Sequence, residues 1–133
     1  MTLYVDTSAL LKRYVDEADS ARAVELLSGD PELVTGRHTE VEVRRNLARL
    51  LEAAEATEAR ASLGRDLESF AIVELDAATC ELAATIAEQT GVRTLDALHL
   101  GAARRLGTAL TFLTFDVRQA QAARSLGFAV AGA

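Results

Sequence analysis

The sequence is poor in the residues that mark secreted, disulfide-rich or membrane proteins. Its 133 residues include one cysteine, one proline and one lysine. Because Cys80 is alone, an intrachain disulfide and a thiolate metal site are excluded, and its place in an expected helix predicts a buried, inert thiol. No apolar run approaches the about 18 residues of a membrane span, and no signal-peptide pattern opens the chain, so we expect a soluble, cytoplasmic protein without membrane contact.

Basic charge is also scarce. The chain has 20 acidic and 14 basic residues, a formal net charge of −6. This balance alone argues against nucleic-acid binding, which normally shows a basic footprint. The argument weakens if several acids converge on one pocket where divalent cations neutralise them. All bases except Lys12 are arginines, which suit planar phosphate recognition, although a GC-rich genome is the simpler explanation of the bias.

Hydrophobic residues make up 50% of the chain, enough for a real core, and they alternate between strand-like and helix-like patterns. Strands are expected over residues 3–5, 33–35, 71–75, 109–113 and 128–130. Helices are expected over residues 8–14, 19–28, 39–56, 57–70, 77–90 and 95–106, with a last one over 117–126. Gly91 should end the helix before it, and Thr94 should cap the next. This order predicts a single α/β domain over 1–133, a three-layer α/β/α sandwich with a mainly parallel sheet of about five strands.

Acidic residues fall at the ends of these elements. Asp6 ends the first strand, Asp116 follows the strand over 109–113, and Asp96 lies in the first turn of its helix. Parallel strands share a carboxyl edge, where ligands of open α/β sheets bind, so these acids can meet there. Carboxylates in one pocket repel unless hard cations such as Mg²⁺ or Mn²⁺ lie among them. Such a site is suited to metal-assisted phosphodiester hydrolysis.

Each acid alone has a simpler interpretation. Asp6 and Asp116 suit helix N-caps, and Asp96 could complement a helix dipole at ~0.3–1 kcal/mol. The helix over 39–56 offers two candidates, Glu40 and Glu42, and on a helical wheel Glu40 lies nearer the centre of the apolar face. Periodicity alone therefore favours Glu40, and the common placement of the acids is the evidence for a site.

Four segments of the chain, in order and with family-like spacing, resemble the PIN-domain ribonucleases. They are Val5-Asp6-Thr7-Ser8-Ala9-Leu10, Glu42-Val43-Arg44-Arg45-Asn46-Leu47, Leu95-Asp96-Ala97-Leu98-His99-Leu100 and Leu113-Thr114-Phe115-Asp116. Within that family the chain looks like a VapC-type toxin of a type II toxin-antitoxin system. The resemblance implies a metal-binding quartet of Asp6, Glu42, Asp96 and Asp116. It prefers Glu42 to Glu40, because Val43 and Leu47 follow Glu42 by one and five positions, as the family pattern requires.

The resemblance further implies that Ser8 and Thr114 hold the carboxylates in place. It implies an endoribonuclease that depends on Mg²⁺ or Mn²⁺, acts on RNA, forms a homodimer and is inhibited by a cognate antitoxin whose C-terminal segment covers the acidic groove. In this interpretation the capping role of Asp6 passes to Thr7 or Ser8. The alternative is a catalytically inactive PIN-fold module for RNA binding or protein interaction.

The remaining polar residues are assigned more simply. His99, three residues after Asp96, is expected to be a buried, hydrogen-bonded structural residue, and His38 to be exposed. Neither histidine has a spacing partner for zinc. Arg44, Arg45 and Arg49 should share the exposed face of the Glu42 helix, as RNA contacts or as a solvated face. Receiver domains and aspartyl-phosphate phosphatases fit poorly, because the acid and lysine spacings that they require are missing.

Overall fold

The sheet has five parallel strands in a computed structural model that describes residues 1–29 and 31–133. The strands are β1 (Thr2–Val5), β2 (Glu32–Gly36), β3 (Ala71–Val73), β4 (Thr111–Thr114) and β5 (Ala129–Gly132). They lie in the order β3-β2-β1-β4-β5, and every neighbouring pair is parallel. β1 is therefore the central strand, with β2 on one side and β4 on the other.

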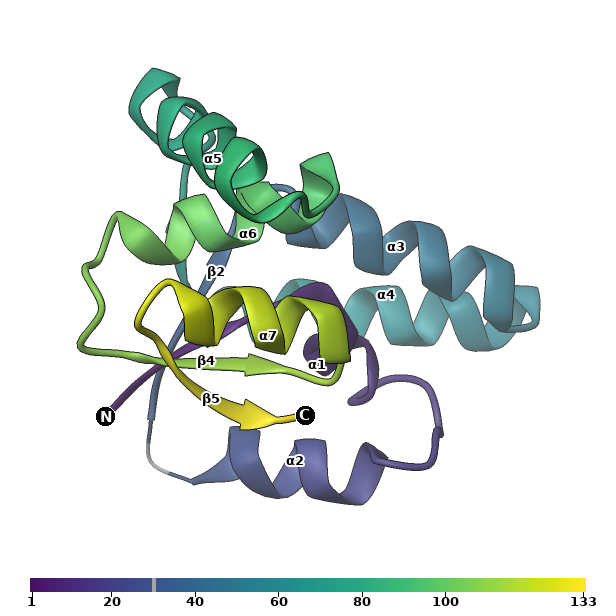
Figure 1. The fold of residues 1–133 in the computed structure, drawn as a ribbon. Coiled ribbons are helices and arrows are strands. Elements are labelled where there is room, and N and C mark those ends of the chain that lie inside the picture. The colour runs from purple at the N-terminus through teal and green to yellow at the C-terminus, as the bar shows by residue number, and fades with distance from the viewer. Residues whose placement is uncertain (30) are drawn as a thin grey trace.

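Seven helices in the described residues connect these strands (Figure 1). They are α1 (Thr7–Leu11), α2 (Ser20–Ser28), α3 (Thr39–Leu50), α4 (Ala53–Leu67), α5 (Ala77–Thr90), α6 (Thr94–Arg104) and α7 (Val117–Ser125). None of the helices in this part of the chain is long and apolar enough to cross a membrane.

Two hydrophobic clusters cover the two faces of the sheet. Alternate residues of β1 point to opposite faces, so Leu3 and Val5 join one cluster and Tyr4 joins the other. Residues of α1 to α4 pack on the first face, and residues of α5 to α7 pack on the second. This arrangement confirms the predicted three-layer α/β/α sandwich with a five-stranded sheet.

Several predicted boundaries differ from the structure. The helix predicted over 39–56 ends at Leu50, because Leu51 is extended (φ −113°, ψ 153°) and α4 begins at Ala53. Apolar periodicity continues across this break and therefore conceals it. The helix predicted over 8–14 ends at Leu11. Thr94 is the first residue of α6 rather than its cap, whereas Gly91 ends α5 with a left-handed φ of 73°, as predicted.

The prediction of a buried Cys80 is wrong, because its side chain is exposed. α5 turns Thr79, Ala83 and Ile86 toward the core. Cys80 follows Thr79 by one position, about 100° around the helix, and so faces away from that side. Its thiol lies 3.7 Å from the Leu75 carbonyl oxygen.

Candidate metal centre

Asp6 lies at the carboxyl end of the central strand and is 4% exposed. Its Oδ1 accepts hydrogen bonds from Ser8 Oγ at 2.7 Å and from the Ala9 backbone N–H at 3.1 Å. Asp6 therefore caps α1 itself, and the prediction that Thr7 or Ser8 takes over this role is wrong. Burial raises the pKa of the Asp6 carboxyl, while the charge of His99 and hydrogen bonds from Thr114 and Ser8 oppose that rise.

Two hydroxyls connect the ends of β1 and β4. Ser8 Oγ lies 3.2 Å from Thr114 Oγ1 and accepts a hydrogen bond from the Phe115 N–H at 3.0 Å. Thr114 Oγ1 accepts from the Asp116 N–H at 3.1 Å. Because β1 and β4 are parallel neighbours, this network holds the Asp6 and Asp116 segments in a defined relation.

Asp116 is the N-cap of α7, and its Oδ1 accepts from the N–H groups of Arg118 at 2.9 Å and Gln119 at 3.1 Å. The capping interpretation is thus correct for this residue. Capping occupies one carboxylate oxygen, so it does not compete with a second role for Oδ2.

Asp96, in the first turn of α6, lies close enough to the other acids to respond to their charges. Burial raises the pKa of its carboxyl, and the charges of Asp116, Asp6 and Glu42 raise it further, against the opposing charge of His99. Gln119 Nε2 donates to the Asp96 carbonyl oxygen at 3.0 Å and so joins α7 to α6. The four acids of the predicted quartet therefore share one electrostatic environment.

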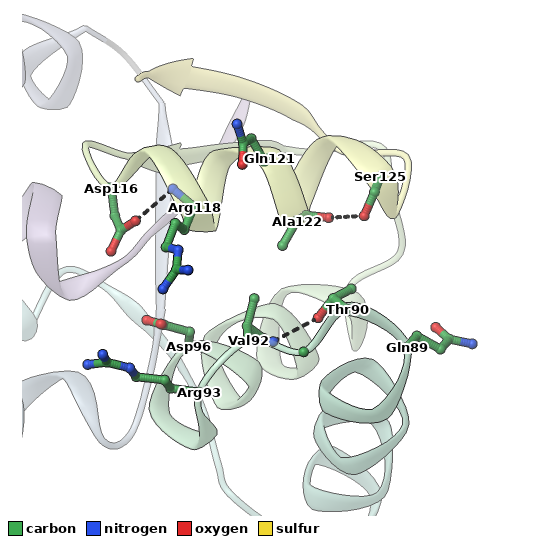
Figure 2. A pocket seen from close by; sticks show the side chains of 11 residues that line it. Gln89, Thr90, Val92, Arg93, Asp96, Asp116, Arg118, Gln121, Ala122 and Ser125 are labelled. Carbon is green, nitrogen blue, oxygen red and sulfur yellow. Dashed lines mark hydrogen bonds between the residues drawn. The ribbon is translucent and has the colours of Figure 1, made fainter.

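Asp96 and Asp116 line a pocket of about 580 Å³ between α5, α6 and α7. Figure 2 shows Arg118 extending from α7 toward Asp96, with Arg93, the residue directly before α6, beside Asp96. Neither arginine stood out in the sequence, because each belongs to a different element and only the fold places them at one opening. The pocket therefore combines carboxylates with guanidinium groups suited to phosphate.

Glu42 and Glu40 point to different surroundings. Glu42 Oε1 accepts from Thr7 Oγ1 at 2.7 Å and lies 2.8 Å from His99 Nε2, and its side chain is 20% exposed. Glu40 is 42% exposed, with its Oε1 3.9 Å from Arg44 Nη1. The fold thus brings Glu42 toward the other acids and leaves Glu40 at the surface. Helical periodicity places Glu40 nearer the centre of the apolar face, whereas the structure buries Glu42, on the flank of α3, more deeply.

Burial raises the pKa of Glu42, but the hydrogen bond and charge of His99, together with the Thr7 hydrogen bond, outweigh it and leave the pKa below its ordinary value. The carboxylate is therefore ionised at neutral pH. An ionised carboxylate is the form that a metal requires.

His99 is 2% exposed, and its Nδ1 lies 2.9 Å from Tyr4 Oη, which confirms the predicted buried, hydrogen-bonded residue. The prediction of an exposed His38 is wrong, because His38 is 8% exposed and its ring centroid lies 4.0 Å from that of His99. His38 Nε2 also lies 3.8 Å from Glu42 Oε1. The signal was present in the sequence, since residues four apart share a helix face.

Arg44, Arg45 and Arg49 are all exposed, as predicted. Arg44 lies near Glu40, and Arg49 Nη2 donates to Asn46 Oδ1 at 2.9 Å. The three side chains therefore lie on the outer, solvent-exposed surface of α3.

Comparison with known proteins identifies the family. The sequence profile of the PIN domain matches residues 3–125. Ribonuclease VapC46 of Mycobacterium tuberculosis is 35% identical over 129 residues, which are 96% of this chain and 95% of that protein.

Solved structures share the fold at lower identity. The crystal structure of Mycobacterium tuberculosis VapC20, described as a sarcin-ricin loop cleaving toxin, has a TM-score of 0.72 and 21% identity, with 96% of both chains covered. A toxin-antitoxin complex from Klebsiella pneumoniae has a TM-score of 0.67 and 18% identity over 90% of this chain and 89% of its counterpart. The match to the PIN profile and the identity to VapC46 together show that this chain belongs to the PIN-domain family, among its VapC-type members.

Proposed function

We propose that this chain is an endoribonuclease toxin that hydrolyses RNA phosphodiester bonds with Mg²⁺ or Mn²⁺ held by Asp6, Glu42, Asp96 and Asp116. The supporting observation is the shared electrostatic environment of the four acids. Asp6, Asp116 and Glu42 each raise the pKa of the Asp96 carboxyl by their charges. Four carboxylates at one sheet edge form an unfavourable arrangement that a divalent cation relieves.

The chemistry of the donors fits a hard cation. Each acid retains oxygen atoms beyond those used in hydrogen bonds, since capping and hydroxyl contacts engage Oδ1 of Asp6, Oδ1 of Asp116 and Oε1 of Glu42. Mg²⁺ and Mn²⁺ prefer oxygen ligands. When bound, such an ion supplies positive charge that activates water and stabilises the charge developing on the phosphate.

The residues of this chain would hold the acids and the RNA in position. Ser8 and the Ala9 N–H fix the Asp6 carboxylate, and the contact between Ser8 and Thr114 carries that order to the Asp116 segment. Arg93 and Arg118 lie at the rim of the pocket beside Asp96 and are placed to bind RNA phosphates on either side of the reacting one. This arrangement answers the objection raised by the net negative charge, since binding depends on the local distribution of charge.

The partners belong to the same proposal. VapC46 is named a ribonuclease, and a toxin-antitoxin complex shares this fold, which supports an RNA substrate and an antitoxin. A basic side chain of a cognate antitoxin would complement the acidic groove, because a guanidinium replaces the charge of the cation. We propose a homodimer acting on cytoplasmic RNA.

The test is cleavage of labelled tRNA, rRNA and mRNA pools with Mg²⁺ or Mn²⁺, with EDTA as the metal-free control. Asp6→Asn retains an N-cap residue at the start of α1 but removes the charge, and it should reduce cleavage by at least about 100-fold. Asp19→Asn is the matched control, since Asp19 is exposed at the start of α2 and its side chain makes no capping hydrogen bond. Absence of metal-dependent cleavage in all pools would refute the proposal and favour the inactive PIN-fold module.

A further inference from the structure

A second set of ligand atoms lies beside the four acids. His38, Glu42 and His99, here called the His–Glu cluster, each present one nitrogen or oxygen, and these atoms all lie within 4.8 Å of one another. Glu42 Oε1 is 2.8 Å from His99 Nε2 and 3.8 Å from His38 Nε2. The cluster joins the start of α3 to α6, two helices from opposite layers of the sandwich.

His38 has no structural partner that accounts for its burial. Within residues 1–29 and 31–133, neither ring nitrogen of His38 makes a hydrogen bond, even though only 7% of the side chain is exposed to solvent. The Leu95 carbonyl lies near the ring and favours its protonated form, but the contact does not reach hydrogen-bond geometry. Buried polar groups are normally paired, so this unpaired imidazole, which faces a carboxylate and a second imidazole, lies where a bound ligand would satisfy it.

The backbone holds His38 in this orientation. A Cβ added to Gly36 would lie 2.8 Å from Nδ1 and 2.7 Å from Cε1 of His38. The ring is therefore seated against the Gly36 backbone, and its Nε2 side faces Glu42. This packing fixes the orientation of the ring before an ion binds, as expected of a metal ligand.

The chemistry of the cluster differs from that of the quartet. Two imidazoles with one carboxylate suit Zn²⁺ and similar transition ions, and three protein ligands with an open position are typical of reactive zinc sites. Tetrahedral zinc with bonds of about 2.0–2.1 Å places its ligands about 3.4 Å apart, between the 2.8 Å and 3.8 Å observed. Each of these two separations differs from the tetrahedral value by less than about 1 Å.

Neighbouring groups are placed to orient both shared ligands. In the metal-free protein the His99 Nε2–H donates to Glu42 Oε1 at 2.8 Å. A metal at Nε2 would displace this proton, and Nδ1, 2.9 Å from Tyr4 Oη, would then carry the ring proton and donate it to Tyr4. The Thr7 hydroxyl donates to Glu42 Oε1 at 2.7 Å and orients the carboxylate. These contacts match the outer hydrogen bonds that metal-binding histidines and carboxylates usually have.

We propose that His38, Glu42 and His99 bind a divalent transition ion of the Zn²⁺ class, at a site that adjoins the four-carboxylate site. The two sites share Glu42, so an ion held by the histidines withdraws that carboxylate from the quartet and inhibits cleavage supported by Mg²⁺ or Mn²⁺. The inhibition rests on the proposed function. The binding of the ion does not depend on the proposed function, and it is tested separately.

The test is titration of tag-free, metal-free protein with Co²⁺, whose visible absorption reports nitrogen ligation and low coordination number. Wild type and Asp116→Asn should both give a spectrum that saturates at one equivalent and is displaced by Zn²⁺. His38→Gln should bind Co²⁺ at least about tenfold more weakly. An unchanged titration of His38→Gln, or loss of the spectrum in Asp116→Asn, would overturn the proposal, because the ion would then lie among the carboxylates.

A measurement on the unmodified protein removes any dependence on the folding of variants. The chain has only two histidines, so their ring nitrogen resonances in ¹H–¹⁵N NMR spectra are easily followed. Zn²⁺ should shift both sets at one equivalent through direct ligation, and Mg²⁺ at the same concentration should produce only smaller shifts, transmitted through the shared Glu42. Histidine resonances unaffected by Zn²⁺ would refute the site whether or not the protein cleaves RNA.

Discussion

Replacing His38 by glutamine should make the metal-free protein less sensitive to mild acid. Burial and then the charge of His99 lower the pKa of His38 from 6.5 to about 4, against the opposing effects of Glu42 and the Leu95 carbonyl. Unfolded chains bind a proton at His38 below pH 6.5, whereas the folded chain resists protonation until about pH 4. The folded state therefore loses stability as the pH falls through this window.

The magnitude follows from the two pKa values. Between pH 7.5 and pH 5, linkage through one histidine with pKa values of 6.5 and about 4 lowers the free energy of unfolding by about 2 kcal/mol. The carboxylates are present in both proteins, so their contributions largely cancel when wild type and His38→Gln are compared.

The assay is urea denaturation in EDTA at pH 7.5 and pH 5. Wild type should lose about 2 kcal/mol more of its unfolding free energy than His38→Gln over this interval. Parallel pH profiles for the two proteins would show that His38 titrates normally in the folded state and would refute its burial as an unpaired, neutral imidazole.

Three further predictions test other parts of the site. Glu42→Gln should reduce cleavage by at least about 100-fold and Glu40→Gln by less than about twofold in the same assay, and the reverse order would assign the ligand to Glu40. Mn²⁺ at about 100 times its Kd should raise the free energy of unfolding by about 2.7 kcal/mol, and an unchanged melting temperature would contradict a preformed site. Gly36→Ala should destabilise the protein by about 1–3 kcal/mol, because its Cβ would meet the His38 ring at 2.7 Å, whereas Gly64→Ala in α4 has nothing within 4 Å and should stabilise by about 0.5–1 kcal/mol. Equal effects of the two glycine substitutions in urea denaturation would show that the His38 ring moves freely.

The architecture was predictable from local patterns. Short apolar β-prone segments alternate with segments of helical spacing, and this alternation specifies a parallel sheet covered by helices. Asp6 and Asp116 were placed at strand ends for the same reason, and β1 and β4 are indeed neighbours. The break after Leu50 was missed because apolar periodicity continues through the turn.

Periodicity did not predict which glutamate at the start of α3 turns inward. The helical wheel favoured Glu40, and only the family motif indicated Glu42, which the structure places against Thr7 and His99. A helical wheel gives the direction of a side chain relative to the apolar face of its own helix. A crevice at the sheet edge is formed by several elements, so the wheel alone does not show which side chain faces it. The orientation of Glu42 therefore depends on how α3 meets α1 and α6.

Residues close together in the chain specify the order of strands and helices, the position of acids at their ends and each motif of the family resemblance. By contrast, the burial of His38 against His99 depends on how distant elements pack together. The same is true of the placement of Arg93 and Arg118 around the pocket that Asp96 lines. α3 and α6 cover opposite faces of the sheet, and their side chains meet only beyond its carboxyl edge. Glu42 and His99 are 57 residues apart in the sequence. Their contact follows from the order of the strands in the sheet, which no local sequence pattern specifies.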